Sequence, residues 1–561
     1  MNNFKRTLLM GSALMLMGLV RADGDCCGTG CCGNGSSNNS NGVCCEGGDF
    51  TSKTFFSDPV IPFASATPWY SQAFRRDVMS ARDGGCGGGV QVEVMGGQTS
   101  QTGSDKLARW FGLNYKSTLK ASNVMDPDAS TSLLEAGADL DVTHFNLYLE
   151  GAADFRSTIS FCPKQSFAGV GLSWRQMVCE NTDKTARWWV ELTAPIIHVK
   201  NDMRLSEKIT TGAGIAALTG TGLDGKPFVN SMVNAFNQSG WKYGKIKGCA
   251  ATTTASSTTT TTNNCCNNNC NDDCDMKRTR MAELEFKVGH NWTSTPCCSI
   301  DNYVGLIFPT GNRPTAHRVF EAVVGTSHFG ISWGSEINFK LYGWEDCDAA
   351  LYYKAATDGR YLFEREETRS FDLVGKQWSR YMAMYKDQAQ MNAQVASQTT
   401  LVGTSGINLM TQCVKVAPRA QFNFNSALVY EGQCFLAEGG WTIYARQAEK
   451  ISACWKEGPA LHGVGNDPQI LTKARTIRDR FEAVDFASTF YDKLKIKKCD
   501  VDWNSAAHPG SLSYTVYGAL GYKWGDVCYP TVLSVGGTYD FGHSNTAIHR
   551  WSLYGKLGVS Y

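Results

Sequence analysis

The sequence lacks any apolar run that would cross a bilayer as a helix once its first 22 residues are passed, although 42% of its residues are hydrophobic. Such a helix needs about 18 or more consecutive apolar residues. An excess of charge of one sign is also missing, since 53 basic residues stand against 52 acidic ones, and this balance argues against a nucleic-acid-binding protein. The nine histidines show no metal-ligand spacing, and no grouping of serine, histidine and aspartate points to a catalytic triad. We therefore expect no enzyme, no bound metal, no cofactor and no nucleic-acid partner.

The N-terminus has the organisation of a secretory signal peptide. Lys5 and Arg6 form a short basic region, an apolar stretch follows, and a small-residue cleavage motif ends at Ala22. A lipoprotein would need a cysteine directly after the cleavage point, and Cys26 lies too far along the chain. We expect residues 1–22 to be removed on export, which leaves a chain that is either soluble outside the membrane or inserted in it as a β-barrel.

Beyond the signal peptide, apolar and polar residues alternate along many segments. Side chains of a strand point alternately to opposite faces, so each segment has one apolar and one polar face. The clearest segment ends the chain, and its apolar face holds Trp551, Leu553, Gly555, Leu557, Val559 and Tyr561; others are 90–94, 145–149, 282–288, 337–341, 422–424 and 512–524. Strands of about ten residues cross a bilayer when tilted. The pattern predicts an all-β fold, a transmembrane antiparallel β-barrel of about 16–18 strands with long, partly helical loops, over residues 88–561.

In such a barrel the polar faces line the lumen, because lipid forces the apolar faces outward. The candidate lumen-facing residues are Glu283, Glu285, Lys287, Glu336, Asn338, Lys340, Gln421, Asn423, Asn425, Thr442 and Arg446. Both signs of charge occur among them, which predicts weak ion selectivity. The same alternation also fits a soluble β-sandwich with these residues on its wet face.

Long loops of different composition separate the strands. We place them near 204–276, 374–397 and 466–494, with a short helix near 229–237 and helical patterns in the latter two. One of the loops is expected to fold inward and narrow the pore, and the sequence does not say which. The charge run from Glu364 to Glu367 is either a ladder in the lumen or a solvated strand beyond the membrane.

Twelve of the 22 cysteines gather in two places. The disulfide candidates are Cys26, Cys27, Cys31, Cys32, Cys44 and Cys45 in a Gly/Ser/Asn-rich extension over 23–87, and Cys265, Cys266, Cys270, Cys274, Cys297 and Cys298 further on. An exported chain meets an oxidising environment, so disulfides are the expected state. Zinc binding by the paired cysteines is the alternative, but no histidine partner accompanies them.

Taken together, the signal peptide, the alternating segments and the final strand ending in Tyr561 resemble Gram-negative outer-membrane porins. The cysteine content is loosely similar to that of chlamydial-type major outer-membrane proteins, without any matched motif. This resemblance implies a protein of the outer membrane of a Gram-negative-type bacterium, surrounded by lipid. It also implies barrel-assembly machinery that reads Leu557, Val559 and Tyr561, a homotrimer, and disulfide links to other envelope proteins.

Three functions follow from these features. The first is a porin-like channel for the passive diffusion of small hydrophilic solutes and ions, selecting by size and by the charge of its lumen. The second is a disulfide-cross-linked structural or adhesive surface protein that the barrel merely anchors. The third is a secreted, soluble β-rich protein. Conductance in a planar bilayer separates the first two, and solubility without detergent identifies the third.

Overall fold

The computed structural model describes residue 53 and most of the chain from residue 87 onward. Outside it lie residues 1–52, 54–86, 127–133, 181–186, 247–251, 254–275, 345–347, 394–401, 454–468, 471–475, 480–495, 525–527 and 543–547, together with 296, 388, 391 and 497. The signal peptide and nearly all of the extension over 23–87 therefore fall outside the described residues. The first described strand begins at Gly88.

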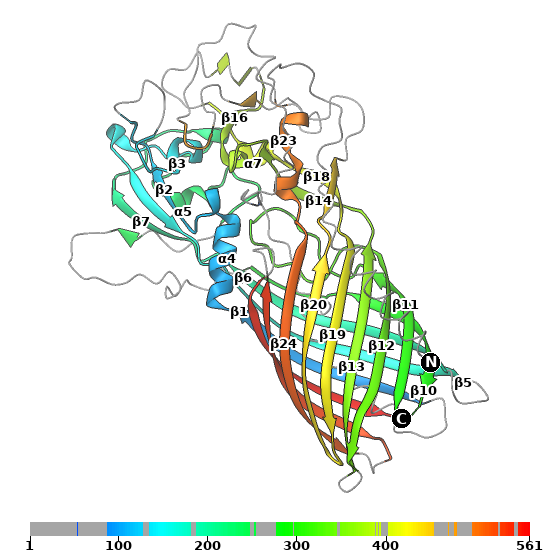
Figure 1. Cartoon of the computed structure of the whole chain (residues 1–561). Helices are drawn as coiled ribbons and strands as arrows, with labels where there is room; N and C mark the ends of the chain where they lie inside the picture. The colour runs from blue at the N-terminus through cyan, green and yellow to red at the C-terminus, as the bar shows by residue number, and fades with distance from the viewer. Residues whose placement is uncertain are drawn as a thin grey trace, which may run out of the picture.

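The long strands form one antiparallel sheet that closes on itself (Figure 1). β26 (Arg550–Ser560) pairs with β1 (Gly88–Thr99), and β6 (Arg187–Asp202) pairs with β10 (Leu284–Ser294). The other members are β5 (Lys164–Glu180), β9 (Met276–Met281), β11 (Cys298–Phe308), β12 (Gly330–Trp344), β13 (Ala349–Leu362), β19 (Arg419–Glu431), β20 (Phe435–Arg446), β24 (Ser511–Trp524) and β25 (Thr531–Gly542). The prediction of an antiparallel β-barrel is confirmed.

Around the described part of the barrel there are twelve strand positions, because β9 and β10 lie end to end beside β6. The predicted number of 16–18 strands was wrong. Alternation is a local signal, and strands outside the barrel such as β4 (Arg156–Ser160) and β7 (Ser206–Thr211) share it. Sequence periodicity therefore identifies strands but does not show which sheet each strand joins.

The two ends of the barrel differ in their connections. At one end, successive strands are joined by three to six residues, and this inner rim also carries Gly88 and Ser560. At the other end, the outer rim, the connections are 100–163, 203–275, 309–329, 363–418, 447–510 and 543–549. Outer-membrane barrels have short periplasmic turns and longer extracellular loops, so the outer rim faces the cell exterior.

The outward face of the barrel is a belt of apolar side chains. Its middle is aliphatic, with Leu553 exposed by 63% and Val535 by 61%. Exposed aromatic rings border this belt: Trp174, Trp188, Trp292, Tyr342, Trp344, Tyr522 and Trp524 toward the inner rim, and Phe308, Phe329, Tyr361, Phe363, Tyr539 and Trp551 toward the outer rim. Two aromatic girdles around an apolar band are the signature of a barrel in a bilayer. The chain is an outer-membrane β-barrel protein. Among its described helices, none is long and apolar enough to span a membrane.

The outer connections 100–163, 203–275, 363–418 and 447–510 supply most of the core of a second body, the outer domain, which stands above the barrel in Figure 1. One sheet of it has the order β3-β2-β4-β7-β8, and another, β14-β18-β21, carries the wall of barrel strands β13, β19 and β20 beyond the rim. The bounds are β2 (Thr118–Ser122), β3 (Leu140–Asp141), β8 (Thr252–Thr253), β14 (Arg365–Ser370), β18 (Thr411–Ala417) and β21 (Lys450–Ala453). Smaller pairings join β15 (Asp372–Leu373) to β23 (Val501–Asp502), and β16 (Ala383–Tyr385) to β17 (Thr404–Ser405) and β22 (Gln469–Ile470).

Short helices connect these sheets. α4 (Gln101–Phe111) leads from β1 into the outer domain, with the side chain of Ser100 accepting a hydrogen bond from the backbone of Gly103 as its N-cap. α5 (Met232–Ala235) lies within the segment where a short helix was predicted, and α7 (Gly406–Leu409) follows β17. The helix predicted over 374–397 was wrong for its first half, which contains the 3₁₀ turn Ser379–Tyr381 and β16 instead. Most of 466–494 lies outside the described residues.

The outer domain has its own aromatic core. Phe145 from the first connection packs against Phe236 and Trp241 from the second, and Trp241 stacks on Tyr381 from the fourth at 5.0 Å. The segment 145–149 was predicted as a barrel strand, and this was wrong: Phe145 ends a 3₁₀ turn (Val142–Phe145) at the centre of this core. Aromatic rings from distant parts of the chain thus convert loops into a folded domain.

Candidate functional site: the lumen wall

Successive side chains of each barrel strand point alternately to the lumen and to the lipid, and the inward ones form the lumen wall. Of the predicted lumen-facing residues, Glu283, Glu285, Lys287, Glu336, Gln421, Asn423, Asn425 and Thr442 are buried on the inward side, whereas Asn338, Lys340 and Arg446 are half-buried. Their strand neighbours Phe286, Phe339 and Leu428 point outward and are exposed. The structure thus brings the predicted residues together inside the barrel, and their part in conduction stays a prediction.

One charged network in the lumen centres on Arg360 of β13. Its guanidinium contacts Glu283 at 2.5 Å and Glu285 at 3.1 Å. Lys287 lies 3.6 Å from Glu285 and 3.9 Å from Asp358, and the hydroxyl of Tyr303 donates a hydrogen bond to Asp358. Every one of these side chains is buried. Buried charges need such partners, because an isolated charge away from bulk water is strongly unfavourable.

A second network centres on Arg175 of β5. Its Nε is 2.7 Å from Glu191 and its Nη2 is 3.3 Å from Glu336, while its guanidinium lies 3.9 Å over the ring of Trp189. The indole nitrogen of Trp189 donates to Asp301 at 3.2 Å. Cation–π contact of this kind suits the flat, delocalised guanidinium.

Sequence reasoning missed several members of both networks, namely Arg175, Trp189, Glu191, Asp301, Tyr303, Asp358 and Arg360. A signal was present, because Arg175 and Glu191 alternate with outward Trp174 and Leu192 just as the predicted residues do with their neighbours. Their pairing was not readable, since it joins strands that are far apart in the sequence.

The wall next to the Arg360 network, on β19 and β20, is lined by amides and hydroxyls. Gln421, Asn423 and Asn425 follow one another on the inward face of β19, and Thr442 lies directly across from Asn425 on β20. The hydroxyl of Tyr517 lies 3.0 Å from Asn425 Oδ1 and 2.9 Å from Glu438 Oε1. Other buried polar atoms have no hydrogen-bond partner among the described residues: Gln421 Oε1, both amide atoms of Asn423, Asn425 Nδ2 and Thr442 Oγ1. Polar atoms in such a position are satisfied by water or by a polar solute.

Lumen-facing aromatic rings lie against glycines of the neighbouring strand. A Cβ on Gly536 would fall 2.4 Å from Tyr554 Cζ, and one on Gly440 would fall 2.6 Å from Tyr517 Cζ. Trp189 covers Gly289 in the same way. A ring in contact with a glycine backbone lies flat on the wall, so these large side chains cover the sheet instead of crossing the lumen.

The connection 309–329 folds into the outer mouth of the barrel. Residues 319–328 are buried without interruption, and the carbonyl of Glu321 accepts a hydrogen bond from Asn201 at the outer end of β6. The backbone of Thr326 donates to Glu283 at 3.2 Å, which ties the segment to the charged network of the lumen. This is the inward-folding loop that the sequence left undecided.

A polar chamber of about 50 Å³ lies between this loop and the wall. In it Glu367 contacts His328 at 3.0 Å and Arg369 at 2.6 Å, and Arg369 lies 3.5 Å from Glu449. Burial alone would raise the pKa of Glu367, but Arg369 and His328 lower it to about 2. Of the predicted charge run, Glu367 therefore lines the mouth, whereas Glu364 is a solvated residue beside Lys415.

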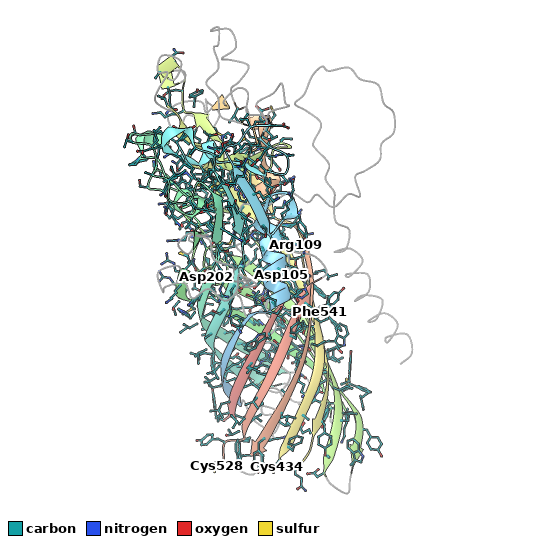
Figure 2. The ribbon with its side chains drawn as sticks, turned by 90° about the vertical axis from the view of Figure 1, so that its left-hand side faces the viewer. Asp105, Arg109, Asp202, Cys434, Cys528 and Phe541 are labelled. Carbon is teal, nitrogen blue, oxygen red and sulfur yellow. The ribbon has the colours of Figure 1, made fainter. Side chains whose placement is uncertain are left out.

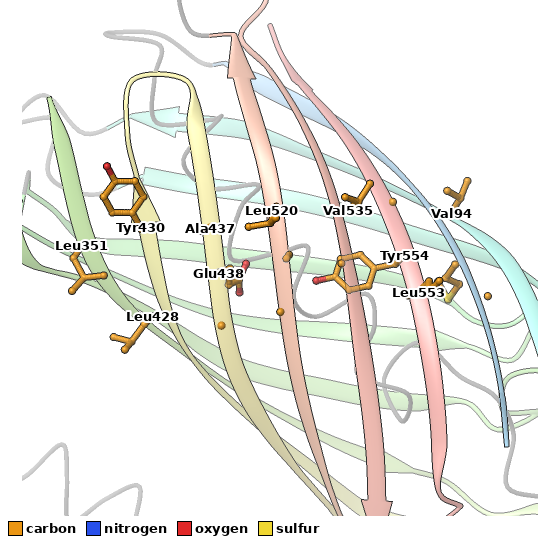
Figure 3. Close-up of a pocket in the computed structure, with 17 residues that line it drawn as sticks. Val94, Leu351, Leu428, Tyr430, Ala437, Glu438, Leu520, Val535, Leu553 and Tyr554 are labelled. Carbon is orange, nitrogen blue, oxygen red and sulfur yellow. The ribbon is translucent and has the colours of Figure 1, made fainter. Parts of the chain in front are cut away.

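A shallow apolar hollow of about 1110 Å³ is found on the lipid-facing side of the wall (Figure 3). Gly439, Gly518 and Gly537 lie directly opposite one another on β20, β24 and β25 and present no outward side chain. Exposed residues such as Leu520 and Val535 border them. The hollow lies within the apolar belt, and the lumen-facing residues Met95, Glu438 and Tyr554 also contribute to its lining.

Most of the predicted disulfide cysteines lie outside the described residues. Cys297 and Cys298, at the inner rim between β10 and β11, carry free thiols. So do Cys434 and Cys528 at the same rim, which Figure 2 shows at the end of the barrel away from the outer domain. Cys162, at the outer rim, is disulfide-bonded. Within the described part of the chain, no group of three or more histidine, cysteine or acidic side chains is placed to hold a metal ion.

No protein-family model matches the chain, and no curated protein matches it. Among solved structures, an outer-membrane channel from Pseudomonas putida F1 superposes with a TM-score of 0.36 at 6% identity, covering 86% of this chain and 98% of that one. A Pseudomonas aeruginosa FadL homologue gives 0.27 at 7% identity, with 85% and 90% covered. The transport unit of the autotransporter AIDA-I from Escherichia coli gives 0.27 at 5% identity, with 89% and 98% covered.

At such low scores and identities these likenesses carry no argument about function. The barrel is established by its strand pairing and by its apolar outer and polar inner faces. The matches give no support to the predicted similarity with chlamydial-type major outer-membrane proteins.

Proposed function

We propose that the chain is an outer-membrane channel for the passive diffusion of small hydrophilic solutes and ions. The observation that carries the proposal is the wall of amides and hydroxyls on β19 and β20, five of whose buried polar atoms have no partner among the described residues. Atoms of this kind are favourable only next to water or a polar solute, so they support a hydrated path along this side of the lumen. An apolar ligand there would leave them unsatisfied.

Selection would act at two levels. The inward-folding loop 309–329 narrows the outer mouth, and the polar chamber beside Glu367 and Arg369 is the first part of the path that a solute meets. Below it, the amide wall adjoins the Arg360 network, because Gln421 and Asn423 lie next to Arg360 and Asp358 on the neighbouring strand. The loop then limits the size of the solutes that pass, and the side chains of the lumen wall determine which solute charge is favoured.

Planar-bilayer recording on the folded full chain tests this proposal. We expect single-channel steps, with a lower conductance for Asn423→Leu, which replaces a polar wall group by an apolar one of similar size. Leu428→Ala, an outward substitution on the same strand, is the matched control and should leave the conductance unchanged. A barrel that migrates in the folded, heat-modifiable form without any conductance would refute the channel.

A second function, a cross-linked structural protein of the envelope, is favoured by one specific observation. Cys297, Cys434 and Cys528 expose free thiols from three different connections of the inner rim. Two such thiols on neighbouring molecules form a disulfide by giving up two protons and two electrons to an oxidant, for which we propose an envelope disulfide oxidoreductase. Native envelopes run on gels with and without reductant test this, and equal mobility in both would exclude it. The same gels, run after mild detergent extraction, report on the proposed homotrimer.

A further inference from the structure

The two residues that flank the stretch 54–86, which lies outside the described residues, are fixed on opposite sides of the membrane. Lys53 belongs to the outer domain: its backbone N–H donates to the carbonyl of Trp110 at 3.0 Å, and its Nζ donates to the carbonyl of Asn504 at 3.0 Å. Trp110 is in the last turn of α4, beyond the outer rim. Gly88 begins β1 at the inner rim. The chain between Lys53 and Gly88 must therefore cross from the outer side of the membrane to the inner side.

The length of this segment is sufficient for the crossing. β1 spans about 40 Å, at about 3.3 Å for each of its 12 residues, whereas residues 54–86 reach about 110 Å when fully extended. Two routes connect the inner rim to the outer domain, one through the surrounding lipid and one through the lumen of the barrel.

The sequence of the segment is unsuited to lipid. Its charged residues are Asp58, Arg75, Arg76, Asp77, Arg82 and Asp83. The stretch 59–74 between these charges contains three prolines and is shorter than the about 18 apolar residues that a spanning helix needs. A chain that crosses lipid without forming a helix leaves its backbone N–H and C=O groups unsatisfied. The lumen is the route that remains.

Contacts lead from Lys53 to the outer mouth of the lumen. The ring of Trp110, whose carbonyl binds Lys53, stacks on His508 with 6.1 Å between the ring centroids. His508 Nδ1 lies 3.4 Å from Nη2 of Arg446, which is the last residue of β20 on the inward face. Lys53 therefore lies close to the place where the lumen opens into the outer domain.

An independent observation shows that the lumen wall is covered. Eight-stranded barrels are just wide enough to be filled by their own side chains, and this barrel has twelve strand positions. Its rings Tyr517 and Tyr554 lie flat on the wall and leave the middle free. The polar side chains of Asn423, Thr442 and Ser534, on three different strands, are nevertheless only 1% exposed, and their side-chain polar atoms have no hydrogen-bond partner among the described residues. Something other than the described wall covers these groups.

We infer that residues 54–86 run through the lumen between the inner rim and the outer domain, so that the chain just before Lys53 emerges at the cell surface. The polar backbone and the charged side chains of the segment suit a wall of amides, hydroxyls and ion pairs. The inference goes beyond the proposed channel and rests on the barrel alone. Solutes that pass the proposed channel share the lumen with this segment.

Photo-cross-linking on the folded full chain tests the route. A diazirine amino acid replaces Asn423, which faces the lumen, or Leu428, which faces the lipid on the same strand. After irradiation, mass spectrometry should find cross-links from position 423 to peptides of 54–86 and none from position 428. No cross-link from position 423 to this segment, or equal cross-linking from both positions, would overturn the inference. Heat-modifiable migration shows that each variant has folded before irradiation.

Antibody binding to intact cells tests where the chain emerges. An epitope inserted between residues 50 and 51, just before Lys53, should be accessible at the cell surface. The same epitope in the turn 432–434 at the inner rim is the control and should be accessible only after the outer membrane is permeabilised. Equal protection of the two epitopes in intact cells would mean that the segment does not cross the barrel.

The outcomes separate this inference from the proposed function. Cross-links and surface exposure in a barrel without conductance would support the route of the segment and refute the channel. Conductance without cross-links to 54–86 would do the reverse.

Discussion

The indole nitrogen of Trp174 donates a hydrogen bond of 2.7 Å to the hydroxyl of Tyr561. This bond joins β5 to the end of the last strand across β1, and the backbones of Tyr561 and Gly88 exchange two further bonds of 3.0 Å. The closing seam of the barrel is therefore fastened at the inner rim by side chain and backbone together.

Replacing Tyr561 by phenylalanine tests the side-chain part of this seam. The change removes the hydroxyl and keeps the ring, so we expect a loss of about 1 kcal/mol in the free energy of unfolding. Urea titration of the folded barrel, read by heat-modifiable migration, measures it. Tyr539→Phe is the control, because Tyr539 is an exposed tyrosine on the outward face of β25. Equal midpoints for the two variants would argue against a role for the Trp174 bond.

Two glycines offer a matched test of how aromatic rings lie on the lumen wall. Gly536→Ala would place a Cβ 2.4 Å from Tyr554 Cζ, and this overpacking should cost about 1–3 kcal/mol of stability. Gly439→Ala adds the same atom on the outward face, where nothing lies within 4 Å, and should be close to neutral. Comparing the urea midpoints of the two variants tests whether the contact with the ring causes the loss of stability. If both are destabilised alike, loss of glycine itself is responsible and the ring contact is not.

The outer domain should lose stability in mild acid because of His144. Burial lowers the pKa of this histidine to about 4, while a hydrogen bond to the carbonyl of Asp479 acts in the opposite direction. The unfolded chain, with a pKa near 6.5, binds more protons between pH 6.5 and 4, so stability falls through that window by about 3 kcal/mol. His508, whose pKa burial also lowers, contributes with the same sign.

Hydrogen exchange of outer-domain peptides in urea, measured from pH 7 to 4, follows this loss. In His144→Gln the pH slope should decrease by about one proton per unfolding event. His317→Gln, an exposed position, should keep the wild-type slope. An unchanged slope in His144→Gln would mean that other groups cause the acid sensitivity.

The mouth of the barrel depends on Glu367. Glu367→Gln removes one charge from a buried cluster and leaves Arg369 with a weaker partner, which should cost about 3–5 kcal/mol. Glu364→Gln breaks an exposed ion pair with Lys415 and should cost less than about 1 kcal/mol. Limited proteolysis within 309–329 reports the change, because His328 and Ser327 attach that loop to Glu367. Equal cleavage of the two variants would show that the loop is held elsewhere.

Much of the barrel could be read from the sequence. Alternation over 90–94, 337–341, 422–424 and 512–524 placed apolar residues on the outside and polar residues on the inside, and each of these segments is part of a barrel strand. The same rule predicted the charged and amide-bearing positions of the wall. The rule worked because each residue of a strand in a bilayer faces either the lipid or the lumen, and lipid requires an apolar side chain.

The alternation of apolar and polar residues could not predict the number of barrel strands or the outer domain. Residues 145–149 alternate like a strand and yet lie in the aromatic core of the outer domain, because Phe236, Trp241 and Tyr381 meet Phe145 there. The alternation of apolar and polar residues depends only on neighbours along the chain. The sheet that a strand joins depends on partners that lie tens to hundreds of residues away.

The sequence by itself thus determined which faces of the strands meet lipid and which meet the lumen, since that depends only on side-chain direction and hydrophobicity. Tertiary structure alone decided how many strands close the barrel, which loop enters its mouth and which charges pair. Arg175 meets Glu336, and Arg360 meets Glu283, only because the curled sheet brings together residues 161 and 77 positions apart in the sequence. Pairing of charges in a barrel is a property of the closed sheet, because each partner comes from a different strand.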